Sequence, residues 1–128
     1  MHGYGDYVQR YGYFARVLAE AGFDVVGIDQ KGFGYSEGLR GFIQSADSVV
    51  DDLAQHVNLI DSKYGGEQVK KFIIGFSLGG LLSVKLNALR PNYFSSIALI
   101  APYFNLLHRQ KFERFNESLE QMNQEAPT

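Results

Sequence analysis

One serine, Ser77, stands in a sequence setting that would make it a nucleophile. It is the centre of Gly75-Phe76-Ser77-Leu78-Gly79, which a further glycine, Gly80, follows. An apolar run precedes this pentapeptide at 72–74, and a helical pattern follows it at 81–89. A G-x-S-x-G sequence between a strand and a helix is typical of a nucleophile elbow, which exposes the serine hydroxyl above a sheet for acyl transfer. The simpler interpretation is a tight turn with an ordinary serine. The flanking pattern favours the nucleophile.

A serine nucleophile needs a base, and the sequence around Ser77 offers no good candidate. No aspartate follows Ser77, and the histidine that does follow it is His108. The downstream glutamates all come after His108; they are Glu113, Glu117, Glu120 and Glu125. We therefore expect His108 to be an exposed polar residue rather than the base. His56, one helical turn after Asp52, has the spacing of a surface pair as readily as of a dyad, and because it precedes the elbow strand we do not expect it to be the base.

The glycine-rich segment 32–38 raises the possibility of nucleotide binding, which its spacing disfavours. It reads G-x-G-x-x-x-G, and a loop rather than a helix follows it. The dinucleotide fingerprint needs G-x-G-x-x-G at the start of a helix, and no P-loop sequence occurs elsewhere. The segment is better explained as a loop whose glycines allow tight turns near the site.

The composition limits the chemistry further. The 128 residues contain no cysteine, which excludes disulfides, thiolate metal sites and a cysteine nucleophile. The formal net charge of −2 argues against a nucleic-acid partner. No apolar window of about 20 residues is present, so no transmembrane segment is predicted. We expect no cofactor and no metal.

The elements that must position Ser77 follow from the apolar periodicity. Helices are predicted at 7–21, 46–64 and 81–89, and mostly apolar strands at 23–29, 69–76 and 96–101. Ser45 is the expected N-cap of the second helix. Alternating helices and strands predict an α/β fold with a parallel sheet and flanking helices. Catalytic groups then lie at the carboxyl ends of the strands, where Ser77 falls.

With these motifs in order, the chain resembles the α/β-hydrolase fold, and within it the monoacylglycerol lipase and serine aminopeptidase-like group. The matching segments are His2 to Tyr7, Asp29 to Gly41, Asp52 to Val57 and Gly75 to Gly80. Phe76 departs from the group, which usually has histidine before the serine, and Lys31 stands where the group often has arginine or an aliphatic residue. Neither difference touches the chemistry directly.

The resemblance implies a role for each matching residue. Ser77 would be the nucleophile, in an elbow shaped by Gly75 and Gly79. The oxyanion hole would consist of the backbone N–H groups of Leu78 and Tyr4. His2 and Gly3 would shape the oxyanion loop without transferring protons. The substrate would be a small acyl ester or lipid, a monoacylglycerol or a lysophospholipid.

The resemblance also implies that residues 1–128 are a single partial α/β-hydrolase domain, from the oxyanion loop to the start of a lid. The upstream strands and the Asp and His of the triad would lie outside it. A helix at 105–124 would place Phe112, Phe115, Leu119 and Met122 on one side, either packed on the domain or meeting lipid as a lid. We expect a cytoplasmic protein, or one that associates with a membrane through the lid. A fragment without activity and an aminopeptidase-like amidase are the competing interpretations.

Overall fold

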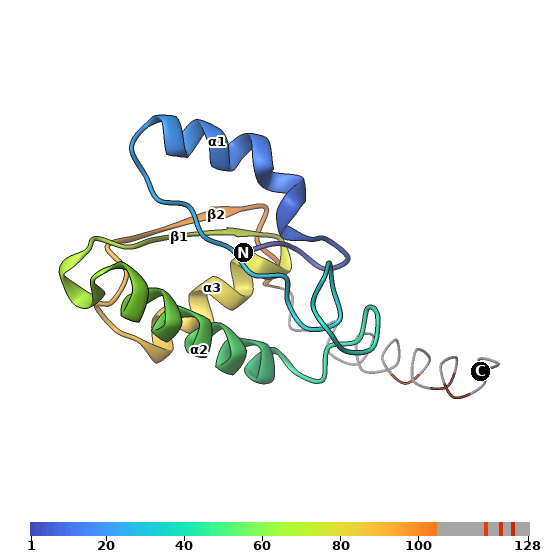
Figure 1. Ribbon diagram of the computed structural model, residues 1–128. Coiled ribbons are helices and arrows are strands. Elements are labelled where there is room, and N and C mark those ends of the chain that lie inside the picture. Colours follow the sequence, from blue (N-terminus) through green and yellow to red (C-terminus); the bar gives the residue numbers. More distant parts are fainter. Residues whose placement is uncertain (105–116, 118–120, 122–123, 125–128) are drawn as a thin grey trace.

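The computed structural model describes residues 1–104, 117, 121 and 124, and these form a short parallel sheet with helices on both faces. Figure 1 shows α1 (Gly12–Glu20) on one side of the strands and α2 (Ala46–Tyr64) and α3 (Leu78–Leu89) on the other. The sheet consists of β1 (Phe72–Phe76) and β2 (Ser96–Ile100), which pair in parallel with Phe72 opposite Ser96 and Phe76 opposite Ile100. The α/β class predicted from the sequence is therefore confirmed.

The core lies between β1 and the α2–α3 layer. Leu82 and Leu86 of α3 are fully buried and belong to one apolar cluster with Ile73 of β1 and Leu53 of α2. Burying an aliphatic side chain of this kind contributes about 1.5–3 kcal/mol, so this layer anchors the strand that carries Ser77. The α1 helix has no buried residue, and its Tyr13 and Val17 are exposed.

The helices begin and end close to the predicted positions, for local reasons. The Ser45 side chain accepts a hydrogen bond from the Ser48 N–H at 3.0 Å and caps α2, and Gly65 ends the helix in the left-handed conformation with a φ of 96°. The first predicted helix is divided into a 3₁₀ turn, Val8–Tyr11, and α1. The third helix starts earlier than predicted, directly after Ser77.

The strand predicted from residue 69 starts at Phe72, because a 3₁₀ turn, Gly66–Gln68, precedes it. The helix predicted at 105–124 lies outside the described residues, apart from 117, 121 and 124.

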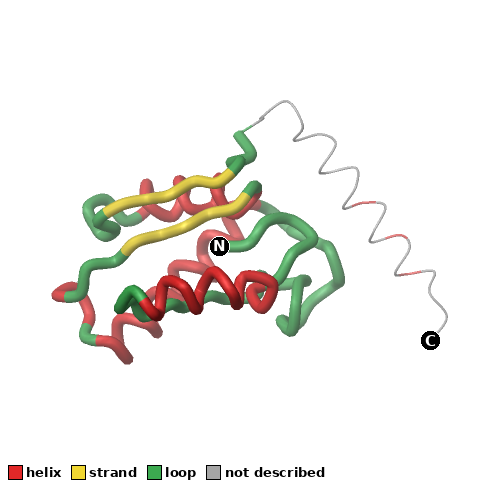
Figure 2. The backbone as a smooth tube through the Cα atoms, turned by 90° about the horizontal axis from the view of Figure 1, so that it is seen from above, coloured by secondary structure: helices red, strands yellow, loops and turns green. Residues whose placement is uncertain are grey.

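The strand predicted at 23–29 is wrong, because this segment has no ladder partner among the described residues. One edge of β1 pairs with β2, and the chain start occupies part of the other. The Met1 ammonium donates to the Ile74 carbonyl, and the Phe76 N–H donates to the Met1 carbonyl at 3.0 Å. This is the pattern of a parallel bridge. Figure 2 shows the N-terminus beside the two strands. Apolar composition alone does not make a strand; a hydrogen-bonded neighbour does.

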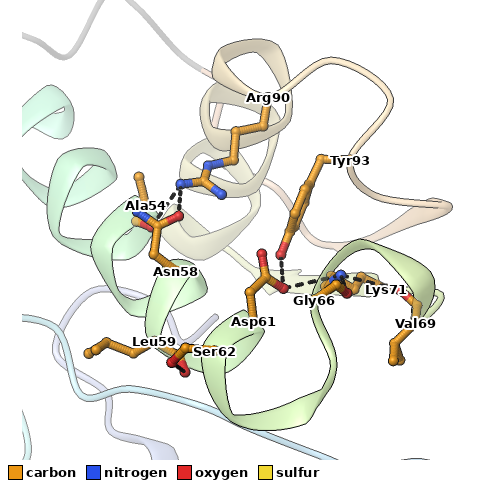
Figure 3. A network of polar contacts seen from close by, with 10 residues as sticks. All are labelled: Ala54, Asn58, Leu59, Asp61, Ser62, Gly66, Val69, Lys71, Arg90 and Tyr93. Atoms are coloured by element: carbon orange, nitrogen blue, oxygen red, sulfur yellow. Dashed lines mark hydrogen bonds and ion pairs between the residues drawn. The ribbon is translucent and has the colours of Figure 1, made fainter.

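A polar cluster fixes the end of α2 to the entry of β1 and the end of α3 (Figure 3). The Asp61 carboxylate accepts the Tyr93 hydroxyl at 2.6 Å and pairs with the Lys71 ammonium at 3.1 Å. Arg90 donates to the Ala54 carbonyl at 3.0 Å and to the Asn58 side chain at 2.5 Å. The cluster lies at the end of the sheet away from Ser77, so it supports the fold rather than the site. No helix within the described part of the chain has the length and apolar character to cross a membrane.

Candidate active site

Ser77 occupies a strained turn between β1 and α3. Its φ of 51° and ψ of −117° put a non-glycine residue at positive φ, and Leu78 begins the helix immediately afterwards. Such a conformation is costly and persists only where the surroundings impose it. Here the Ser77 N–H donates to the Ile100 carbonyl at 3.0 Å, and the Ser77 carbonyl accepts from the N–H groups of Gly80, at 2.9 Å, and Tyr103, at 3.0 Å. Backbone contacts thus hold the turn, and the exposed Ser77 side chain is left for chemistry.

The glycines around Ser77 allow backbones to meet where a side chain would not fit. A Cβ on Gly75 would lie 2.4 Å from the Gly79 carbonyl oxygen and 2.5 Å from the Ser83 Oγ. A Cβ on Gly79 would lie 2.4 Å from the Met1 carbonyl oxygen and 2.5 Å from that of His2. The elbow and the chain start are therefore in backbone contact.

The predicted oxyanion loop lies directly against the serine. A Cβ on Gly3 would be 3.2 Å from the Ser77 Cβ and 3.9 Å from its Oγ, so the loop passes within contact distance of the hydroxyl. The next residue, Tyr4, is anchored by its hydroxyl, which donates to the Gly41 carbonyl at 2.7 Å. The Leu78 N–H lies in the first turn of α3, where helical N–H groups lack an intrahelical acceptor, and it has no hydrogen bond to any described residue.

Behind the loop, His2 is buried and bonded through both ring nitrogens. Its Nε2 lies 3.0 Å from the Gln30 backbone N–H, and its Nδ1 lies 2.8 Å from the Gly3 carbonyl oxygen. Burial lowers the pKa of His2, although the Gly3 carbonyl and the carboxylates of Asp29 and Asp6 partly oppose this effect. The ring is therefore neutral at pH 7 and is tied to the loop by the hydrogen bond to Gly3.

The glycine-rich loop is organised by Asp29, a role that sequence reasoning missed. Its carboxylate accepts the Val8 N–H at 2.7 Å and the Tyr35 N–H at 2.9 Å. Burial alone would raise the pKa of Asp29, but these two hydrogen bonds and the charge interaction with His2 together leave the pKa below its usual value. Gly34 packs on the carboxylate, where a Cβ would lie 2.1 Å from the Asp29 Oδ2. The run of glycines that follows Asp29 was the sequence feature that could have indicated this role. The loop binds its own chain here, which fits the predicted turn-rich loop.

No described residue serves as a base for Ser77. His56 lies on α2 and lines a cavity of about 320 Å³ that also borders Gln30 and Leu53 but not Ser77. Burial lowers the pKa of His56. His108 and the glutamates Glu113, Glu120 and Glu125 lie outside the described residues, and Glu117 is exposed. The described residues also contain no group of His, Cys, Asp and Glu side chains able to hold a metal ion.

A strained serine between a parallel strand and a helix, with a glycine loop against it, has the geometry of an α/β-hydrolase elbow. The family model described as serine aminopeptidase, S33 matches residues 1–126. The chain therefore belongs to this family of α/β hydrolases.

Its relatives include monoacylglycerol lipases. The chain is 38% identical to the monoglyceride lipase of Rattus norvegicus over 101 residues, which are 79% of this chain and 33% of that protein. It is 32% identical to lysophospholipase L2 of Escherichia coli K12 over 105 residues, 78% of this chain and 30% of that protein. The crystal structure of the Paleococcus ferrophilus monoacylglycerol lipase matches with a TM-score of 0.66 and 31% identity, covering 80% of this chain and 37% of that one. The chain thus spans about a third of the length of these relatives.

Proposed function

We propose that this chain carries the nucleophile of a serine ester hydrolase that acts on monoacylglycerols or lysophospholipids. The observation that carries the proposal is the exposed Ser77 at a φ of 51°, with Gly3 packed against it. The printed names of the relatives, monoglyceride lipase and lysophospholipase, supply the substrate class. Their matches to this chain support an ester with a glycerol-containing leaving group.

In the proposed reaction, the Ser77 Oγ attacks the ester carbonyl carbon while its proton passes to a base. The N–H groups of Leu78 and Tyr4 stabilise the oxyanion of the tetrahedral intermediate, and each such donor contributes about 3–4 kcal/mol. The intermediate expels the alcohol, which takes up the proton, and leaves an acyl ester on Ser77. Water then attacks this ester, releases the fatty acid and restores the hydroxyl. The base has to come from outside the described residues.

The first experiment tests the nucleophile separately from its base. The 128-residue chain is incubated with a fluorophosphonate probe at increasing imidazole concentrations, since free imidazole can take the place of a histidine base. We expect labelling that rises with imidazole and is abolished in Ser77→Ala. The control is Ser95→Ala, which removes an exposed serine outside the elbow. Folded protein that stays unlabelled at every imidazole concentration would contradict the proposal.

One observation favours a second candidate, in which the chain by itself is catalytically inactive. Neither a histidine nor a carboxylate of the described residues bonds to the Ser77 hydroxyl. In that case, the fluorophosphonate probe labels Ser77 when imidazole is present, but the chain hydrolyses no monoacylglycerol when imidazole is absent. Substrate class is decided in the same assay by comparing a monoacylglycerol, a lysophospholipid and an aminoacyl anilide. Preference for the anilide would favour the amidase instead.

A further inference from the structure

Gln30 makes two hydrogen bonds to His2, at the base of the loop that touches Ser77. Its backbone N–H donates to the His2 Nε2 at 3.0 Å, and its side-chain Nε2 donates to the His2 carbonyl at 2.8 Å. Both residues are almost completely buried, with exposed fractions of 3% for Gln30 and 1% for His2. These contacts join positions 28 residues apart in the chain, so they hold the chain start against the segment after Asp29.

The contacts determine which nitrogen of His2 carries the proton. A backbone N–H can only donate, so the His2 Nε2 that faces Gln30 must be the acceptor. The proton of the neutral ring is then on Nδ1, which donates to the Gly3 carbonyl at 2.8 Å. Protonating Nε2 would set two N–H groups against each other. The charged groups that act on the ring are Asp29, Asp6 and the Met1 ammonium.

Gln30 fulfils this role while leaving one of its own atoms unsatisfied. Its Oε1 is buried and has no hydrogen-bond partner among the described residues. The opposite orientation of the amide would place Oε1 against the His2 carbonyl and lose the 2.8 Å bond. The amide therefore acts through its Nε2 donor, without which the buried His2 carbonyl would lose its 2.8 Å hydrogen bond.

We propose that Gln30 is the positioning residue of the oxyanion loop: its backbone N–H holds His2 as the neutral Nδ1–H tautomer, its side chain binds the His2 carbonyl, and together these contacts fix Gly3 and the Tyr4 N–H beside Ser77. The loop has the backbone contacts to transmit this restraint. The His2 carbonyl that Gln30 binds is also the oxygen that a Cβ on Gly79 would approach to 2.5 Å, so it lies against the elbow. The inference rests on the proposed function for its catalytic meaning, but its geometry can be tested without activity.

The test is NMR spectroscopy of the 128-residue chain with ¹⁵N-labelled histidine. We expect His2 to be the Nδ1–H tautomer at pH 7, identified through the loss of its signals in His2→Asn, with His56 as an internal reference. In Gln30→Leu, which keeps the backbone N–H, we expect the Tyr4 amide to exchange its hydrogen about tenfold faster, because one buried hydrogen bond is lost. We also expect His2 to titrate at a higher pH as the loosened ring gains access to water.

The matched control is Gln44→Leu, the same exchange at an exposed position, which should change neither quantity. A wild-type His2 that is the Nε2–H tautomer or is charged at pH 7 would overturn the proposal, as would unchanged Tyr4 exchange in Gln30→Leu. If Gln30→Leu does not fold, Gln30→Glu decides, since it keeps the size but replaces the donor by an acceptor. We expect the same His2 tautomer in Ser77→Ala. The test of Gln30 therefore remains valid even if Ser77 proves unreactive.

Discussion

Glycine residues at and near the elbow share one physical task, which is to let two backbones touch. At Gly75 and Gly79 the space for a Cβ is already taken by carbonyl oxygens, at 2.4 Å in both cases. Backbone atoms cannot move aside as the end of a flexible side chain can, so a methyl group must displace a whole segment. At Gly79 that segment is the chain start, which forms the wall of the site. Gly12, at the start of α1, has no described atom near its Cβ position.

Gly79 and Gly12 make a matched pair for mutation. Gly79→Ala should lower the free energy of unfolding by about 1–3 kcal/mol, although alanine is the better helix former, because its Cβ collides with Met1 and His2. Gly12→Ala should leave it unchanged or raise it by up to about 1 kcal/mol, because the Cβ points into open space. Urea unfolding followed by circular dichroism measures both. Equal stability of the two variants would show that the chain start does not pack on the elbow.

At the scale of elements, the cluster around Asp61 joins α2 to the strand that leads to Ser77. Burial alone would raise the pKa of Asp61, but the Tyr93 hydroxyl and the positive charges of Lys71 and Arg90 together lower the pKa. A carboxylate with a lowered folded pKa stabilises the fold at every pH above the unfolded value of 3.8, and this contribution is lost as the pH falls through the folded pKa. The Lys71 and Asp61 side chains are only 15% and 20% exposed, so solvent screens the pair weakly.

Asp61→Asn should therefore destabilise the protein in a pH-dependent manner. We expect a loss of about 1 kcal/mol at pH 7, where the carboxylate is charged, and a smaller loss near pH 3. The difference between wild type and variant in urea unfolding at the two pH values measures this. Asp51→Asn, at an exposed position on the same helix, is the control and should show no comparable change. A loss that is independent of pH would mean that the charge of Asp61 is not what stabilises the cluster.

At the scale of the whole molecule, the described sheet has an open edge along β1. In a parallel strand, the N–H and C=O groups of one residue point to the same edge. Beyond the bridge to Met1, the backbone groups of Phe72 and the N–H of Ile74 therefore have no partner among the described residues. The exposed Phe72 lies at this edge, and its ring packs edge-on against the exposed Phe23 with centroids 5.9 Å apart. Such an edge favours pairing with another strand.

We accordingly expect the 128-residue chain to self-associate, with a sedimentation coefficient that rises with protein concentration. Phe72→Lys, which places a charge on the open edge, should reduce this association. Leu89→Lys introduces the same charge at an exposed leucine, the last residue of α3 rather than a strand residue, and should have a smaller effect. Sedimentation velocity at several concentrations distinguishes the two. A chain that stays monomeric at all concentrations would show that the open edge of β1 does not pair with other copies.

The sequence by itself determined what depends on neighbours along the chain. The sharp turn at Ser77, the Ser45 cap and the end of α2 at Gly65 follow from local backbone chemistry, and the structure has them at the predicted residues. Periodicity also predicted β1 and β2, because apolar residues bury wherever the sheet forms.

Only the tertiary structure decided what depends on contacts between distant residues. Residues 23–29 have the composition of a strand, yet they pair with neither described strand; the residue that bonds to the other edge of β1 is Met1, 73 positions from Ile74. The partners of Asp29 and Gln30 could not be predicted either, since each side chain acts on a backbone group brought to it by folding. Hydrogen bonds of this kind leave no periodic trace in the sequence, and through them the fold places the Gly3 loop beside Ser77.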